Sequence, residues 1–376
     1  MMSRRSLFLG TIALAATSLC SARAASKSQL TAARLVVQEI LAANPIPALS
    51  VAVMRGDEIL WAEAFGQADV ELSVKATPQH RFRLGSVSKV ITATLSAQLA
   101  ARGAVDLDAP ISRYMPELPQ QHQATTLRQL LTHRGGIRHY EDKDWSITPP
   151  GPIDHRRYNS TADILAVFID DPLIAPPGTM VSYSTFGYSL ASLVLEAATK
   201  VPFLELIQRE IAAPCGITIS ADAPAQIVPN RVSGYHPGEI MRRIDPSFAG
   251  EWGNIPQNNP AYKWAGGGLL ATPTDLARFG ASHLAAGKLS KEALTALFTI
   301  HTQATDRSPP LGLGWRIDRD GSNRLRWHHA GGQDGARASL VVYPVERLSI
   351  ALATNVTQHP GDVNGPSAKI ADAFAA

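Results

Sequence analysis

The chain has 376 residues, of which 45% are hydrophobic and 18% are charged, so it is not a mainly disordered protein. Its 28 glycines and 26 prolines show no repeating period, which excludes collagen-like and low-complexity proteins. The formal net charge is only +3, aromatic residues make up 6%, and no long run of lysine or arginine occurs. These features argue against a nucleic-acid groove or a base-stacking surface.

The first 24 residues have the form of a cleavable signal peptide. Arg4 and Arg5 precede an apolar stretch over 11–19, which is shorter than the about 20 residues of a membrane span. The paired arginines resemble a twin-arginine signal, although Sec export stays open. We therefore expect cleavage after Ala24 and a bacterial periplasmic or secreted protein, with an uncleaved N-terminal anchor as the alternative. Cys20 has no small residue before it, which argues against a lipoprotein anchor.

Cleavage at this position has two consequences for the mature chain. It removes Arg4, Arg5 and Arg23 from the 35 basic residues, which leaves 32 basic against 32 acidic residues and no net charge. It also removes Cys20, so Cys215 becomes the single cysteine and no intrachain disulfide is expected. Stability must then come from core burial, for which a chain of roughly 350 residues is ample.

Apolar periodicity predicts the secondary-structure elements in chain order. The N-terminal part is predicted to form a helix over 28–43, a hairpin of strands over 48–54 and 59–65, and a long apolar helix over 86–101 ended by Gly103. From Asp106 to Tyr262 no convincing strand pair occurs, and helices are predicted over 126–132, 161–169, 186–199 and 203–211. Strands return over 313–317, 324–328, 338–343 and 348–354, and a helix is predicted over 368–375.

This order predicts an α/β (α+β) fold. An antiparallel sheet flanked by helices would be built from both chain ends, with an all-α lobe inserted between them. We place the body at residues 25–105 and 265–376 and the helical lobe at 106–264. Thr272 followed by Pro273 predicts the N-terminus of one further helix.

The most informative short motif is a serine followed three positions later by a lysine, Ser86-Val87-Ser88-Lys89. Residues three apart share one helix face, so the Lys89 amine is expected within hydrogen-bonding reach of the Ser86 hydroxyl. A serine hydroxyl needs a neighbouring base to act as a nucleophile, and a helix N-terminus adds backbone N–H donors for an oxyanion. The alternative is a helix-capping serine followed by an exposed lysine.

Motifs of several other enzyme classes are missing from the sequence. It contains no Gly-x-Ser-x-Gly elbow, no His-Glu-x-x-His, no Walker loop and no dinucleotide-binding glycine pattern. Eleven histidines are scattered along the chain, and only His133 with His139 and His328 with His329 lie close together. Because no cysteine joins either pair, we expect no metal site and no cofactor.

Two further segments follow the serine motif along the chain, Tyr183-Ser184-Thr185 and His329-Ala330-Gly331. Together with the serine motif, they resemble in the same order the motifs of the serine β-lactamase and penicillin-binding-protein superfamily, class C branch. The resemblance spans about residues 35–375. The stretches 130–141, 183–188 and 262–268 look most like the mitochondrial serine β-lactamase-like proteins and their bacterial relatives. Thr185 stands where the superfamily usually has Asn, and this subfamily also shows Thr there.

The resemblance implies a role for each motif residue. Ser86 would be the nucleophile, Lys89 would orient it and share its proton, and Tyr183 would pass that proton to the leaving group. Which of Lys89 and Tyr183 takes the proton first stays open. Because an ordinary tyrosine has a pKa near 10, Tyr183 needs cationic neighbours such as Lys89 for this role. The alternative for Tyr183 is a tyrosine that only packs.

The resemblance also implies a pocket wall formed by the third motif. His329 would face the pocket from an edge strand, where it would stabilise the tyrosine oxygen or contact a substrate carboxylate, whereas His328 points to the opposite face. A solvated histidine at a strand end is the alternative. The backbone N–H groups of Ser86 and Gly332 would form the oxyanion hole, with Gly331 beside them, because glycine lets the strand approach the substrate closely.

The expected activity follows from the same resemblance, which implies an acyl-serine hydrolase of amide or ester bonds with peptides favoured over β-lactams. Thr185 lacks the two amide donors of Asn, which argues against strong β-lactamase activity. The substrate would be a small peptide, a peptidoglycan-derived compound or an ester. No nucleic-acid partner and no stable membrane insertion after signal cleavage are expected, and the oligomeric state stays open. Alternatives are an esterase, a D-Ala-D-Ala carboxypeptidase, a weak β-lactamase, or a catalytically weak protein that binds peptides or peptidoglycan.

Overall fold

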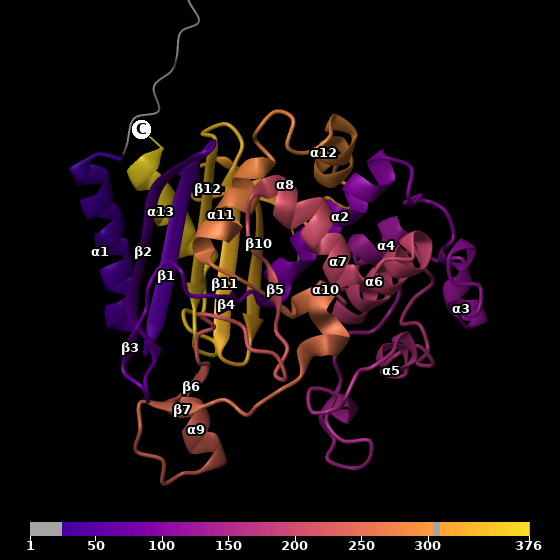
Figure 1. Ribbon diagram of the computed structural model, residues 1–376, viewed down its shortest axis with the longest axis horizontal. Coiled ribbons are helices and arrows are strands. Elements are labelled where there is room, and N and C mark those ends of the chain that lie inside the picture. The colour runs from indigo at the N-terminus through magenta and orange to yellow at the C-terminus, as the bar shows by residue number, and fades with distance from the viewer. Residues whose placement is uncertain (1–24, 304–308, 376) are drawn as a thin grey trace, which may run out of the picture.

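The computed structural model describes residues 25–303 and 309–375, so the expected signal peptide and Cys20 lie outside the described residues. The main strands are β1 (Ala48–Arg55), β2 (Glu58–Asp69), β3 (Val74–Lys75), β9 (Arg316–Arg319), β10 (Leu325–Gln333), β11 (Ala336–Tyr343) and β12 (Leu348–Thr354). They form one antiparallel sheet in the order β3-β2-β1-β12-β11-β10-β9 (Figure 1). The N-terminal hairpin thus pairs with the last strand of the chain.

Helices form the rest of the structure. The α-helices are α1 (Lys27–Ala43), α2 (Ser88–Ala101), α3 (Gln120–Gln123), α4 (Leu127–Leu131), α5 (Thr161–Leu165), α6 (Thr185–Thr199), α7 (Phe203–Ile207), α8 (Ala213–Cys215), α9 (Gly238–Ile244), α10 (Trp264–Gly267), α11 (Pro273–Ser282), α12 (Lys291–Phe298) and α13 (Asn364–Phe374). Short 3₁₀ turns are η1 (Gly85–Val87), η2 (Ile111–Arg113), η3 (Asp142–Trp145) and η5 (Pro260–Lys263), and η4 (Gln208–Ala212) is a π-helical turn.

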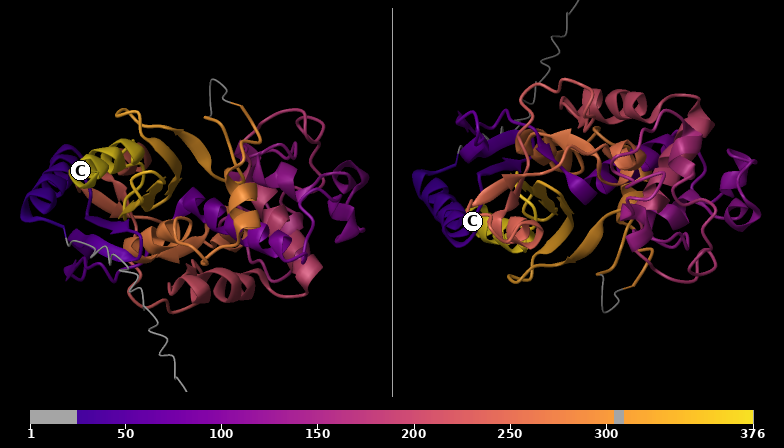
Figure 2. Two further views of the ribbon diagram at one scale, coloured as in Figure 1. Left: turned by 90° about the horizontal axis from the view of Figure 1, so that it is seen from above. Right: turned by 90° about the horizontal axis from the view of Figure 1, so that it is seen from below.

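Both faces of the sheet are covered by helices. Helices α1 and α13 lie side by side on one face, and α11 packs on the other (Figures 1 and 2). The side chains of β1 alternate accordingly: Leu49, Val51 and Val53 join the apolar cluster under α1 and α13, whereas Ala52 and Met54 join the cluster on the opposite face. A strand buried on both faces reads as a continuous apolar run, which explains its clear signal in the sequence.

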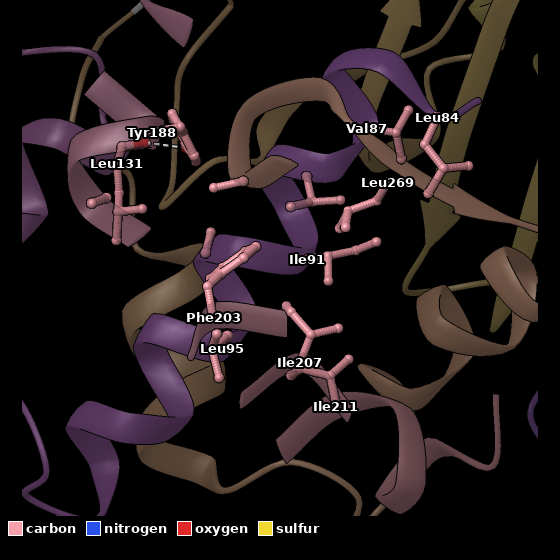
Figure 3. Packing of buried hydrophobic residues seen from close by; sticks show 14 of the residues in the cluster. Leu84, Val87, Ile91, Leu95, Leu131, Tyr188, Phe203, Ile207, Ile211 and Leu269 are labelled. Carbon is pink, nitrogen blue, oxygen red and sulfur yellow. Dashed lines mark hydrogen bonds between the residues drawn. The ribbon is translucent and has the colours of Figure 1, made fainter. Parts of the chain in front are cut away.

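Helix α2 crosses from the sheet into the helical part and is buried along most of its length. Its Ile91 and Leu95 pack among Phe203, Ile207 and Ile211 of α7 and η4 (Figure 3). One continuous apolar cluster therefore joins the α11 face of the sheet to the helical part. The N-terminal turn of α2 lies where the two parts meet.

The predicted fold class is confirmed, because the antiparallel sheet contains both chain ends and a largely helical segment is inserted between them. The expectation that this segment lacks strand pairs is wrong. It contains the antiparallel pair β6 (Tyr235–Pro237) and β7 (Trp252–Asn254), and β5 (Ser220–Ala221) pairs with β8 (Leu269–Ala271), which also pairs with β4 (Phe82–Arg83). Strands of two or three residues are too short to show a period-two pattern.

Several element boundaries differ from the predicted ones. Helix α5 ends at Leu165 rather than 169, and the strand predicted over 313–317 begins at Arg316, because Gly314 adopts a positive φ of 71° in the preceding turn. Strand β10 continues to Gln333, beyond the predicted end at 328, so the whole His329 motif lies within this strand. No helix within 25–303 or 309–375 is both long and apolar enough to cross a membrane.

Candidate active site

Ser86 lies in the 3₁₀ turn η1, directly before α2, rather than in the first turn of the α-helix itself. The preceding Gly85 has a positive φ of 49°. A Cβ atom at Gly85 would come within 2.7 Å of the backbone nitrogen of Gly332 on β10. Only glycine therefore allows both this turn and the close approach of β10 to the Ser86 backbone.

Lys89 is fully buried one turn after Ser86. Its Nζ donates to the Gly266 carbonyl oxygen at 2.6 Å, to Thr185 Oγ1 at 3.2 Å and to Ser86 Oγ at 3.3 Å. Burial, and then the positive charge of Arg316, hold the pKa of Lys89 well below its ordinary value. The alternative of an exposed helix lysine is wrong, because the amine lies in a dry site among hydrogen-bond acceptors.

Tyr183 lies just before α6 and faces both members of the serine–lysine pair. Its ring centroid is 4.7 Å from Lys89 Nζ, and its side chain shares a hydrogen bond with Ser86. Burial raises the pKa of Tyr183 to about 12, although the hydrogen bond to Ser86 and the charge of Arg316 act in the opposite direction. The expectation that a charged Lys89 lowers the pKa of Tyr183 is therefore not met, because burial favours the neutral form of both groups.

His133 and His139 hold the backbone that follows Tyr183. The backbone N–H of Ser184 donates to His133 Nδ1 at 3.2 Å, and that of Thr185 donates to His139 Nδ1 at 3.3 Å. Their rings lie 4.4 and 5.3 Å from the Tyr183 ring. Burial lowers the pKa of His133 strongly and that of His139 to about 4, which keeps both acceptor nitrogens free of protons. The sequence marked these histidines only as neighbours in the chain.

Strand β10 brings His329, not His328, to Tyr183. The His329 ring centroid is 6.4 Å from that of Tyr183, and burial followed by the charge of Arg316 holds the pKa of His329 well below its ordinary value. His328 faces the other way, where its Nε2 lies 3.1 Å from Asp318 Oδ2. Strand β9 pairs with β10 only as far as His328, so β10 lies at the sheet edge from His329 onward.

The two glycines after His329 bring β10 against the turn that carries Ser86. A Cβ atom at Gly331 would overlap the carbonyl oxygen of Leu84 and lie 3.0 Å from the backbone nitrogen of Ser86. The backbone nitrogen of Gly332 lies close to Gly85. The backbone nitrogens of Ser86 and Gly332 therefore lie at one corner, as an oxyanion hole requires.

Arg316 is a residue of this site that the sequence reasoning missed. It is the first residue of β9 and is half-buried. Its charge lowers the pKa of Lys89, Tyr183 and His329. Among residues 25–303 and 309–375 it forms no ion pair with an acidic side chain. No sequence pattern marks it, since a lone arginine at a strand start is common on protein surfaces.

Thr185 is buried at the start of α6, where its hydroxyl accepts the hydrogen bond from Lys89 described above and also contacts the Tyr140 side chain. Gly266 packs against it, because a Cβ atom there would come within 2.7 Å of Thr185 Cγ2. Thr185 therefore belongs to the surroundings of Lys89. The described part of the chain contains no group of three or more His, Cys, Asp or Glu side chains placed to hold a metal ion.

Comparison with known proteins places this geometry in a family. A family model described as Beta-lactamase matches residues 33–374. The mitochondrial serine beta-lactamase-like protein LACTB of Mus musculus is 26% identical, over 82% of this chain and 72% of that protein. Penicillin-binding protein 4 of Amycolatopsis lactamdurans is 28% identical, over 75% of this chain and 74% of the relative.

A solved structure shows the same fold. D-amino acid amidase from Ochrobactrum anthropi SV3 superimposes with a TM-score of 0.77 at 21% identity, covering 92% of this chain and 98% of the amidase. The matched family region contains the whole sheet, the helical segment and every motif residue around Ser86. The chain therefore belongs to the beta-lactamase family, whose members are serine hydrolases.

Proposed function

We propose that the protein is an exported serine hydrolase that cleaves amide bonds, chiefly in peptides, through an acyl-serine intermediate. The observation that carries this proposal is the buried Lys89 amine, 3.3 Å from the Ser86 hydroxyl, with its pKa held far below the ordinary lysine value. A buried amine without its proton is a base, so the pair supplies a nucleophile and a proton acceptor together. Export rests on the signal-like residues 1–24 alone.

The reaction would proceed in two balanced steps. In the first, Lys89 takes the proton of Ser86, Oγ bonds to the substrate carbonyl carbon, and the backbone N–H groups of Ser86 and Gly332 stabilise the oxyanion. The carbon–nitrogen bond then breaks, and the proton passes through the Tyr183 hydroxyl to the leaving amine. In the second step, water gives a proton to the same groups while its oxygen bonds to the acyl carbon. The bond between that carbon and Ser86 Oγ then breaks, and the proton returns to Oγ, which releases the acid and free Ser86. The elevated pKa of Tyr183 suits a group that carries a proton rather than a phenolate.

Arg316 supports a peptide as substrate. Its guanidinium has no carboxylate partner in the described chain and lies near Tyr183, the proposed proton donor to the leaving group. A leaving amino acid with a free carboxylate would complete the missing ion pair. The names of the relatives agree with amide chemistry, since one is a penicillin-binding protein and a solved neighbour is an amidase. Ester or slow β-lactam cleavage would be secondary.

The proposal is tested by covalent labelling with a fluorophosphonate probe and by a panel of peptides, nitrophenyl esters and a chromogenic cephalosporin. One label per chain is expected at Ser86, and Ser86→Ala should lose both the label and all turnover while melting at the same temperature. Ser88→Ala is the matched control, because Ser88 accepts a hydrogen bond from the Leu269 backbone and is not proposed to react. Labelling that persists in Ser86→Ala contradicts the assignment, and substrate binding without turnover would favour the catalytically weak binding protein.

A further inference from the structure

A second cation that forms no ion pair within the described residues lies near the turn that carries Ser86. Lys263 is the last residue of η5 and directly precedes α10. Within the residues that the structure describes, its amine forms no ion pair and no side-chain hydrogen bond. This differs from Lys143, which pairs with Asp171 and Glu141 at the surface.

The stem of Lys263 lies against the turn that carries Ser86. A Cβ atom at Gly267 would be 3.7 Å both from Lys263 Cδ and from the backbone carbonyl carbon of Gly85. The amine lies 5.9 Å from the Tyr140 ring centroid and 5.6 Å from that of Tyr262. The stem of Lys263 therefore lies near the turn of the nucleophile, and its amine lies beside aromatic rings, which attract a cation but cannot neutralise its charge.

Exposed apolar surface continues from these rings. The ring of Trp145 is 5.6 Å from that of Tyr140, and 44% of Trp145 is exposed. An apolar chain lying on Tyr140 and Trp145 would remove this surface from water. The surroundings of Lys263 thus combine an apolar wall with one positive charge.

None of the described charged groups around Lys263 forms an ion pair with its amine. Burial lowers the pKa of Lys263 to about 8, and the positive charge of Arg83 acts in the same direction. Asp334 and Asp154 raise that pKa, but neither forms an ion pair with the amine. The amine is therefore mostly charged at neutral pH, and an incoming anion would recover part of its desolvation cost.

The charges of Lys263 and Arg316 act on different groups around the nucleophile. The charge of Arg316 acts on Tyr183 and His329, next to the proposed leaving group. The charge of Lys263 acts instead on His139, whose ring centroid lies 5.3 Å from that of Tyr183. If the leaving group lies on the Arg316 flank, the acyl part of the substrate extends toward Lys263.

We propose that Lys263 binds a carboxylate on the acyl part of the substrate, so that the enzyme prefers acyl groups with an apolar stem ending in an acid. This inference rests on the proposed serine hydrolase function. It names a substrate class that the motif residues do not define, namely peptides or amides whose acyl fragment carries its own negative charge.

Two esters with the same leaving group test the proposal: mono-4-nitrophenyl glutarate, whose acyl chain ends in a carboxylate, and 4-nitrophenyl 5-oxohexanoate, whose acyl chain ends in a neutral methyl ketone. Because nitrophenol carries no carboxylate, Arg316 contributes equally to both. The wild-type protein should show a kcat/KM about tenfold higher for the glutarate, as one charge-assisted hydrogen bond provides. Lys263→Met should bring the ratio close to one, and Lys263→Arg should restore much of it.

Lys291→Met is the matched control, since Lys291 is an exposed lysine at the start of α12 and should leave the ratio unchanged. Ser86-dependent cleavage of both esters with a wild-type ratio near one would overturn the Lys263 proposal and leave the proposed function standing. A ratio that persists in Lys263→Met would do the same. If neither ester is cleaved and Ser86 takes no label, the proposed function fails, and this inference fails with it.

Discussion

The two sides of Ser86 are built in different ways. On the helical side, the buried Lys89 amine of α2 lies beside the Tyr183 ring and donates to Thr185 of α6 and to the Gly266 carbonyl of α10. On the strand side, β10 contributes mainly backbone, and its glycines allow it to lie against Gly85 and Ser86. One side thus controls where the proton goes, and the other provides donors for an oxyanion.

The difference shows that the reactivity of Ser86 depends on two separate structural conditions, one on each side. The helical side depends on burial, because removing water lowers the pKa of Lys89 and raises that of Tyr183. The strand side depends on the absence of side chains, because a single added methyl group would push β10 away from the turn. We expect substitutions on the helical side to reduce activity by changing the proton affinities of Lys89 and Tyr183. Substitutions on the strand side should reduce activity by displacing β10.

Replacing Lys89, the proposed base on the helical side, should remove nearly all activity. Lys89→Met keeps the length and apolar stem of the side chain, and it should lower kcat/KM by roughly three orders of magnitude or more. The double variant Ser86→Ala with Lys89→Met should be scarcely worse than either single one, because both residues act in one step. Steady-state kinetics check this, and losses that simply multiply would contradict a shared step.

The same Lys89→Met variant tests the effect of burial on stability. The pKa of Lys89 is lower in the folded chain than the value near 10.4 of an unfolded lysine, so between those two values the unfolded chain binds more protons. The free energy of unfolding should therefore rise with pH across that window in the wild type. Lys89→Met should lose this rise and gain most relative stability at the acidic end, measured by urea unfolding at several pH values. Parallel curves would mean that Lys89 is not desolvated.

Adding one methyl group should damage the strand side. In Gly331→Ala the new Cβ would overlap the Leu84 carbonyl, so β10 must move and carry the Gly332 N–H with it. Displacing one oxyanion donor costs about 100-fold in kcat. Gly321→Ala is the control, because a Cβ at Gly321 meets no atom within 4 Å. Equal activity of the two variants would show that β10 does not define the oxyanion site.

Loss of the His133 acceptor should affect the helical side more mildly. His133 has a positive φ of 58°, so His133→Gly and His133→Asn both tolerate its backbone, but only Asn keeps an acceptor for the Ser184 N–H. Misplacing Tyr183 in the Gly variant should lower kcat about 10- to 100-fold, with much of the rate restored in the Asn variant. Similar rates in the two variants would mean that the hydrogen bond does not position Tyr183.

The smallest effect is expected from Thr185→Asn. An amide donor at this position should help to hold a β-lactam carbonyl by about 1 kcal/mol, which raises the acylation rate of a chromogenic cephalosporin several-fold. Peptide turnover should not improve, because the Lys89 amine now bonds a threonine hydroxyl. Stopped-flow acylation and peptide assays measure the two effects, and unchanged rates in both would mean that Thr185 does not face the acyl group.

Local signals explain why much of the fold was predictable. Strands β1 and β12 are buried on both faces and read as continuous apolar runs, and α11 begins at Thr272-Pro273, whose capping hydrogen bond the structure contains. Short strands such as β6 and β7 gave no such signal, because their pairing depends on the chain around them.

The serine motif, the tyrosine motif and the histidine motif could be recognised from the order of residues in the chain, because each is a short contiguous pattern. The surroundings of these residues could not. Lys89 meets Gly266 across 177 positions of sequence and Thr185 across 96, and the charge of Arg316 reaches the same amine from β9. Burial and electric fields depend on distance in space. Only the folded chain therefore determines that Lys89 loses its proton and that Tyr183 keeps its own. The same holds for the lack of an ion-pair partner at Arg316 and Lys263 within the described residues.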